Sequence, residues 1–251
     1  HDVYSWFLLG NGYIFHRIVL CLSWLDMDIN EKLDKLCLKH FQDRAYVADG
    51  IFYGSAVENW EKIYPKVLFI LKQPNSDELL GEDYREYDFG TCIEEHVWRE
   101  LLSRLYGIMN AMKEGFPSYE EAVGADALKE AFTKYPFAVI NVIKDIGAGT
   151  TSTGHLKRYA NENLDFLKAQ LDLLQPNLIV CCGSGVFDIV NRAVSPSIGS
   201  SGNWLKYNKD RKIVFFDTYH PGKPNTWRKL KEAYEQPLKE YCHFLEEQNN
   251  K

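Results

Sequence analysis

Four short apolar runs constrain the fold of this chain more than any other feature of its sequence. Each run is rich in β-branched and aromatic residues and does not alternate with polar ones. The runs are "KVLFILK" (66–72), "PFAVINVI" (136–143), "NLIVCCG" (177–183) and "KIVFFDT" (212–218). Because continuous apolar strands suit a sheet that is covered on both faces, as parallel sheets are, we predict that these runs are buried strands of one sheet.

Helical patterns separate the four runs. Apolar residues recur at helical spacing between the first run and the second, and a leucine stripe that stops at Pro176 precedes the third. A charged amphipathic segment at 226–248 follows the fourth run. Strands that alternate with helices favour helices on both faces of one sheet. The sequence therefore predicts an α/β fold, a single-domain three-layer α/β/α sandwich around a mostly parallel four-stranded sheet, over residues 27–251.

The segment 1–26 differs from the rest of the chain. It is apolar and aromatic, but His16 and Arg17 interrupt it, and a membrane span needs about 20 mostly apolar residues. Asp2 stands where a secretory signal peptide has a basic region. Met27 opens a segment that reads like a natural start. We therefore predict that residues 1–26 are a non-native or poorly structured extension.

Charge and cysteine content limit the function. The net charge is −6, so any nucleic-acid surface must be a local patch. The six cysteines include no Cys-x-x-Cys pair, and Cys181 and Cys182 lie inside an apolar run. These features argue against a zinc site, a redox motif and a disulfide framework, and they favour reduced cysteines in a cytoplasmic protein. We expect a cytoplasmic monomer with no metal, no cofactor and no membrane contact.

Polar residues follow the predicted strands at their carboxyl ends, where open α/β sheets bind ligands. The first strand leads into Lys-Gln-Pro-Asn at 72–75, the second ends in Asn141, and the fourth leads into His-Pro-Gly at 220–222. Amide and imidazole groups suit recognition of a planar polar heterocycle, because an amide such as that of Asn141 donates and accepts at once. The residue types therefore point to a nucleobase site.

Other residues near these ends suit contact with DNA. Phe89 lies after the first strand end, where an aromatic ring can stack on a base. His220 can donate to a base oxygen and stabilise the negative charge that leaves with the base. Trp227 can act as a wedge in DNA, and cations beside it suit a phosphate backbone. These cations are Lys223, Arg228, Lys229 and Lys231.

Several segments between residues 64 and 235 together resemble a known family. They are "VLFILKQPN", "DFGTCIEEHVWRELLSRL", "FAVINVIK", "LDLLQPNLIVCCGSGVFDIV" and "TYHPGKPN". In the same order they resemble the proline-loop motif, the Phe-plus-helix segment, the strand with the uracil-reading Asn, the helix-Pro-strand-Gly-helix segment and the His-Pro-Ser motif of the uracil-DNA glycosylase superfamily.

The resemblance implies a DNA glycosylase of base excision repair, a hydrolase that removes uracil or a related damaged base flipped from DNA and leaves an abasic site. It implies that Asn141 reads the uracil edge, Phe89 stacks on the base and His220 stabilises the departing anion. The implied catalytic residues are Gln73 and His220, the implied base-binding residues are Pro74, Asn75, Phe89 and Asn141, and the implied DNA-binding residues are Gly222, Lys223, Trp227 and Arg228.

The chain departs from the family pattern at three places. Gln73 stands where the family has a water-activating Asp, Asn or Glu, and Gln supplies neither a base nor a charge. Lys72 beside it does not favour a cationic transition state. Gly222 replaces the usual Ser and removes a hydroxyl contact to phosphate. The Cys of the family's iron–sulfur branch has no counterpart in "YANENLDFL", so we predict no such cluster.

Two other functions compete with this reading. Gln73 motivates a protein that keeps the fold and binds nucleic acid or a nucleobase without catalysis. The same strand ends also suit an unrelated α/β enzyme that uses a nucleotide or a sugar phosphate. Gly-Ser-Gly at 183–185 has neither the spacing of a nucleophile elbow nor that of a dinucleotide fingerprint, and we interpret it as a tight strand-to-helix turn.

Overall fold

A computed structural model describes most of this chain. The described residues are 27–42, 44, 46–74, 83–112, 114–145, 147, 151–194, 200–222 and 226–249. The predicted extension at 1–26 and the candidate residues Asn75 and Lys223 lie outside them, so the predictions about these residues stay predictions.

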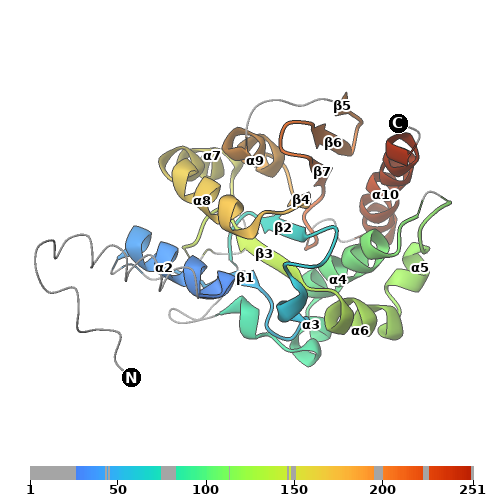
Figure 1. Ribbon diagram of the computed structural model, residues 1–251, viewed down its shortest axis with the longest axis horizontal. Helices are drawn as coiled ribbons and strands as arrows, with labels where there is room; N and C mark the ends of the chain where they lie inside the picture. Colours follow the sequence, from blue (N-terminus) through green and yellow to red (C-terminus); the bar gives the residue numbers. More distant parts are fainter. Residues whose placement is uncertain are drawn as a thin grey trace, which may run out of the picture.

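Seven strands of the described residues form one sheet in the order β1-β3-β2-β4-β7-β6-β5 (Figure 1). The four predicted runs form its centre as β2 (Val67–Leu71), β3 (Phe137–Asn141), β4 (Leu178–Cys182) and β7 (Ile213–Thr218). These neighbours pair in parallel, and every residue of β2, β3 and β4 is buried. The prediction of buried strands in an α/β fold is confirmed.

The prediction of a four-stranded, mostly parallel sheet is wrong in detail, because three more strands make the sheet mixed. β1 (Gly50–Ile51) pairs antiparallel with β3, and β6 (Leu205–Asn208) pairs antiparallel with β7 and with β5 (Ser200–Ser201). β1 and β5 have two residues each, and the middle residues of β6 are half-buried. Short edge strands carry no continuous apolar run, so the pattern did not predict them.

Helices cover both faces of the sheet (Figure 1). The described helices are α2 (Ile29–Phe41), α3 (Phe89–Glu94), α4 (His96–Met109), α5 (Tyr119–Ala122), α6 (Ala125–Lys134), α7 (Thr153–Glu162), α8 (Leu164–Leu174), α9 (Val186–Val194) and α10 (Trp227–Asn249), with 3₁₀ turns η1 (Val57–Asn59) and η2 (Tyr84–Glu86). None of these helices has both the length and the apolar character that crossing a membrane requires.

Two separate apolar cores lie on the two faces of the sheet. Phe69 of β2 belongs to the core that includes residues of α4, α6 and α10, whereas its neighbour Ile70 belongs to the core with α7, α8 and α9. Successive side chains of a strand point to opposite faces, so a strand covered on both faces must be apolar throughout. This requirement explains why the four runs do not alternate.

A proline inside the last helix ties that helix to the sheet. Pro237 lies within α10 and has no N–H, so the carbonyl of Ala233 lacks its usual helical donor. The hydroxyl of Thr218, at the end of β7, donates to that carbonyl at 3.2 Å. This side-chain hydrogen bond fixes α10 against the strand that leads to His220.

Candidate functional site

The carboxyl ends of the central strands bring the candidate residues to one edge of the sheet. Asn141 ends β3 in register with the last residue of β2. Lys72 Nζ donates to Ser184 Oγ at 3.2 Å, which links the end of β2 to the end of β4. The N–H of Gly183 donates to the carbonyl of the last residue of β7 at 2.8 Å, and His220 follows two residues later. The predicted site therefore extends across four adjacent strand ends.

Asn141 presents a buried amide whose two groups have no hydrogen-bond partner in the part of the chain that the structure describes. The residue is 1% exposed, and neither Oδ1 nor Nδ2 has a hydrogen-bond partner among the described residues. Its backbone N–H donates to Asp49 Oδ2 at 2.7 Å, so the strand end itself is held in place. Burying an unpaired polar group costs about 1–3 kcal/mol. An amide in this state suits a ligand that offers one acceptor and one donor.

The Asp49 carboxylate that accepts from the Asn141 backbone belongs to a buried ion pair. Lys144 Nζ lies 2.6 Å from both carboxylate oxygens of Asp49, and both side chains are fully buried. Gln170 Nε2 donates to the same carboxylate at 3.5 Å. Sequence reasoning missed this pair, because the two residues are 95 positions apart and no local pattern joins them. The one sequence signal of this pair was a lysine, Lys144, directly after the apolar run 136–143.

Gln73 uses its amide to hold a loop. Its Nε2 donates to the carbonyl of Asp145 at 3.1 Å, and the hydroxyl of Thr151 donates to its Oε1. A Cβ at Gly147 would lie 2.2 Å from the amide carbon of Gln73, so a side chain there would displace the Gln73 amide. The N–H of Gly147 also donates to the carbonyl of buried Pro74 at 3.1 Å. The residue predicted to contact water therefore also ties the end of β2 to the segment after β3.

A hydrogen bond to His220 indicates which of its ring nitrogens carries the proton. The N–H of Gly222 donates to His220 Nδ1 at 3.1 Å, so Nδ1 is an acceptor and the ring proton is on Nε2. A side chain at Gly222 would lie 3.2 Å from a methyl of Val97 and 3.4 Å from Nδ1. Glycine thus avoids a tight contact with Val97 at this turn. Nε2 is then the ring nitrogen that carries the donor.

Arg104 of α4 holds the backbone next to His220 from inside the protein. It is 3% exposed, and its Nη1 donates to the carbonyl of Tyr219 at 3.2 Å. Burial raises the pKa of the neighbouring Cys182 thiol to about 11, although the guanidinium opposes this, so the thiol is protonated at neutral pH and unsuited to nucleophilic attack. Sequence reasoning missed Arg104, because nothing in the α4 pattern distinguishes a buried arginine from an exposed one.

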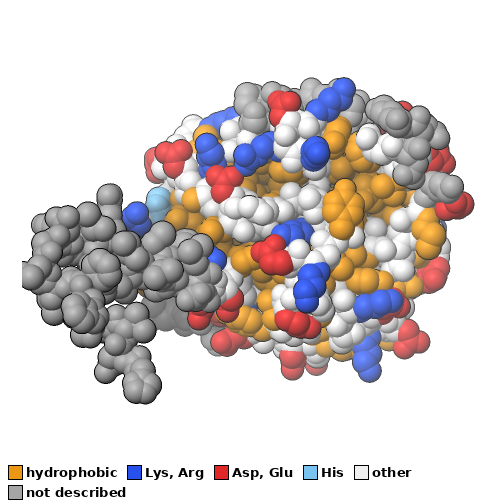
Figure 2. Space-filling view, viewed as in Figure 1, with side chains coloured by type: hydrophobic (Ala, Val, Ile, Leu, Met, Phe, Trp, Pro, Cys, Tyr) orange, Lys and Arg blue, Asp and Glu red, His pale blue; other side chains and the backbone are white. Residues whose placement is uncertain are grey.

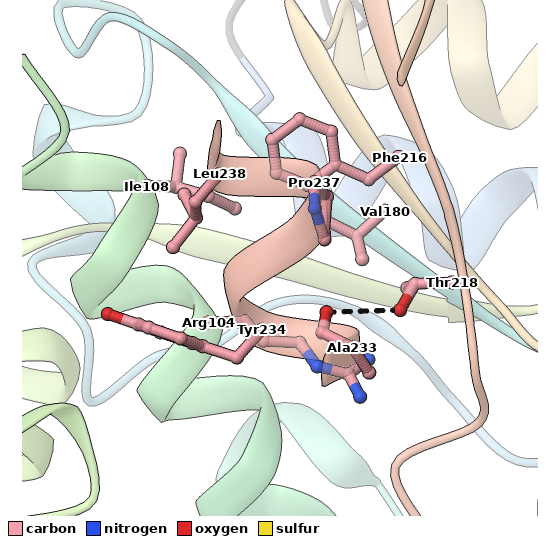
Figure 3. A pocket seen from close by; sticks show the side chains of 9 residues that line it. All are labelled: Arg104, Ile108, Val180, Phe216, Thr218, Ala233, Tyr234, Pro237 and Leu238. Atoms are coloured by element: carbon pink, nitrogen blue, oxygen red, sulfur yellow. Dashed lines mark hydrogen bonds between the residues drawn. The ribbon is translucent and has the colours of Figure 1, made fainter. Parts of the chain in front are cut away.

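Arg104 also lines a small cavity of about 10 Å³ between α4, α10 and the sheet (Figure 3). Its Nε and Nη2 have no hydrogen-bond partner among the described residues. Thr218 and Ala233, which are joined by a hydrogen bond, both line this cavity. Tyr234 and Pro237 of α10 line it as well. The cavity is too small for a nucleobase, so it is not the candidate base-binding site at the strand ends.

Phe89 lies on the α6 side of the molecule. It begins α3, which Asp88 caps by accepting from the N–H of Thr91 at 2.8 Å. Its half-buried ring contacts Phe132 of α6, with the ring centroids 5.8 Å apart. These contacts are those of a core residue, and its stacking on a base stays a prediction.

The start of α10 presents an aromatic ring and cations to solvent. Trp227 is 54% exposed, and its ring lies 4.8 Å from that of Tyr119. Arg228 is exposed, whereas Lys231 pairs with Glu120 at 2.6 Å. On the face drawn in Figure 2, acidic and basic side chains are interspersed and do not form one large basic patch. A DNA contact at this helix start would therefore be local, as the net charge also requires.

The comparisons with known proteins supply no family. No protein-family model matches this chain, and no curated protein matches it. The resemblance to the uracil-DNA glycosylase superfamily therefore stays a prediction, and the function must be inferred from the chemistry of the site itself.

Proposed function

We propose that this protein is a DNA glycosylase that resembles the uracil-DNA glycosylase superfamily and hydrolyses the N-glycosidic bond of uracil or a related base flipped from DNA. The observation that carries the proposal is the buried amide of Asn141, whose donor and acceptor have no partner among the described residues. Uracil offers N3–H as a donor and O4 as an acceptor side by side. An asparagine amide matches this edge with two hydrogen bonds.

His220 supports the second part of the proposal. Its Nε2–H can donate to the O2 oxygen of uracil, where negative charge collects as the glycosidic bond breaks. The hydrogen bond from Gly222 to Nδ1 keeps this proton on Nε2. Arg104 holds the preceding carbonyl and so supports the backbone from which the ring projects. The base then leaves as an anion, and the sugar passes through a cationic state that water captures.

Gln73 has a limited role in this reaction. Its Oε1 accepts from Thr151 and has a second lone pair, which can accept from the attacking water. A neutral amide cannot take the proton from that water, so Gln73 orients it without acting as a general base. Both ends of the Gln73 amide are already hydrogen-bonded within the protein, to the Asp145 carbonyl and the Thr151 hydroxyl. These bonds favour the alternative function, a protein that binds nucleic acid or a nucleobase without catalysis.

The test is base release from labelled oligonucleotides that carry uracil, hypoxanthine or xanthine, single-stranded and double-stranded, followed by alkaline cleavage of the abasic product. We expect release by the wild-type protein and a loss of about 10²- to 10³-fold in His220→Ala. His243→Ala is the matched control, because that histidine is 71% exposed near the far end of α10.

Three outcomes separate the candidate functions. Release that depends on His220 supports the glycosylase. Binding of uracil-containing DNA by the folded protein without release of any base supports the non-catalytic binder. Thermal stabilisation by free nucleotides but not by DNA supports an enzyme that acts on a nucleotide or a sugar phosphate.

A further inference from the structure

Lys72 is a cation that base hydrolysis alone does not explain. It follows β2 directly, beside Gln73, where a positive charge opposes the build-up of positive charge on the sugar. A lysine amine is also a nucleophile toward carbonyl carbon, with which it forms a Schiff base. The product of the proposed reaction, an abasic sugar, opens to an aldehyde at C1′. An amine at this position would therefore meet a carbonyl that the site itself generates.

The packing around Gly183 brings the Lys72 side chain next to His220. A Cβ built on Gly183 would lie 3.1 Å from Lys72 Cε and 3.3 Å from His220 Cβ, so both side chains lie against this glycine. Gly183 has φ +107°, a conformation that L side chains rarely adopt. Lys72 Nζ donates to Ser184 Oγ at 3.2 Å, which directs the amine along the strand ends.

The strand order places this amine between the two groups that would hold the nucleotide. Asn141 ends β3 and His220 follows β7, and β2 and β4 lie between these two strands. A base read by Asn141, with its leaving-group oxygen at His220, leaves the sugar over the ends of β2 and β4, where Lys72 lies. We propose that Lys72 gives the protein a second activity as an abasic-site lyase, an inference that rests on the proposed function.

The chemistry needs only water besides the DNA. Lys72 Nζ, after losing its ammonium proton to solvent, forms a bond to C1′ of the open sugar, and one water leaves to give the imine. C2′ then loses a proton to solvent, and the electron pair forms the double bond that expels the 3′ phosphate as the C3′–O bond breaks. Hydrolysis of the imine by one water returns the amine and leaves a strand ending in an unsaturated aldehyde.

The experiment uses the full chain and a duplex with a preformed abasic site, so that it does not depend on base removal. Sodium cyanoborohydride reduces the imine, and the covalent protein–DNA adduct is separated by gel electrophoresis and its modified peptide located by mass spectrometry. We expect an adduct at Lys72 and strand incision without alkali. Lys72→Arg keeps the charge but cannot form the imine, so both should be lost. Lys168→Arg, at an exposed position on α8, should trap like the wild type.

The outcomes distinguish this inference from the proposed function. No adduct with the wild-type protein, or an adduct that persists in folded Lys72→Arg, overturns the lyase. Lys72→Met, checked by thermal unfolding, repeats the test if the arginine variant is unstable. Uracil release without an adduct contradicts only the lyase. An adduct at Lys72 without release of any base contradicts the glycosylase and supports the lyase.

Discussion

Asn141 and Gln73 are both side-chain amides at the ends of neighbouring strands, and the protein uses them in opposite ways. The Gln73 amide is hydrogen-bonded at both ends, to the Asp145 carbonyl and the Thr151 hydroxyl. The Asn141 amide is more deeply buried, yet neither end has a partner among the described residues. The same functional group is thus hydrogen-bonded at the end of β2, whereas at the end of β3 it has no partner among the described residues.

The two amides differ in what they contribute to stability. A paired amide contributes about 1 kcal/mol to stability, whereas a buried unpaired one costs about 1–3 kcal/mol. A buried amide without a partner is therefore a candidate binding group. The backbone of Asn141 is meanwhile held by Asp49, so the cost is confined to the side chain.

The largest effect we expect comes from breaking the support behind Asn141. Lys144→Met leaves the Asp49 carboxylate buried without its cation and should lower the free energy of unfolding by about 3–5 kcal/mol. Urea denaturation measures this loss. Replacing Asp49 by Leu in the same protein should recover part of it, because no unpaired charge then remains. A loss below about 1 kcal/mol, as found for exposed pairs, would contradict the account.

Asn141→Leu tests the unpaired amide directly. The substitution keeps a similar volume and removes both polar groups, so base release should fall by about 10²-fold. The free energy of unfolding should not fall, since the desolvation cost of the amide disappears. Single-turnover release and urea denaturation measure the two quantities. Unchanged release, or a stability loss like that of Lys144→Met, would show that the amide serves the structure.

Gln73→Met is the matching test at the end of β2. Losing the hydrogen bonds to Asp145 and Thr151 should lower the free energy of unfolding by about 1–2 kcal/mol. Base release should fall by less than about 10²-fold, because a general base, which Gln73 is not, contributes at least that much. Gln248→Met, exposed near the end of α10, is the control. An unchanged free energy of unfolding together with abolished base release would contradict this prediction and show that the Gln73 amide is catalytic.

Asp217 of β7 gives the smallest expected effect, and it depends on pH. Burial raises the pKa of this carboxyl above its usual value, although nearby Lys206 opposes the shift. Because the folded-state pKa lies above the unfolded one, wild-type stability falls as the pH rises from the unfolded pKa through the folded pKa. Asp217→Asn should therefore be more stable than the wild type near neutral pH, with a difference that shrinks toward pH 4. Urea denaturation across this range measures it, with exposed Asp210→Asn as the control. A difference that does not vary with pH would exclude this ionisation as its cause.

Long-range contacts set the limit of what local patterns predicted about this site. The strand ends at Asn141 and His220 were predictable, because each follows a continuous apolar run. The partners of these residues were not, since Asp49 is 92 positions from Asn141 and Arg104 is 115 positions from Tyr219. No periodicity connects such residues, and only the folded chain brings them together.

The sequence by itself determined the α/β class, the four central strands and the edge of the sheet where the candidate residues meet. It did so because a strand buried on both faces must be apolar along its whole length. The tertiary structure alone decided the short antiparallel strands, the tautomer of His220 and the opposite states of Asn141 and Gln73. These depend on which backbone or side-chain group lies within hydrogen-bonding distance, and that distance is set by packing between segments far apart in the chain.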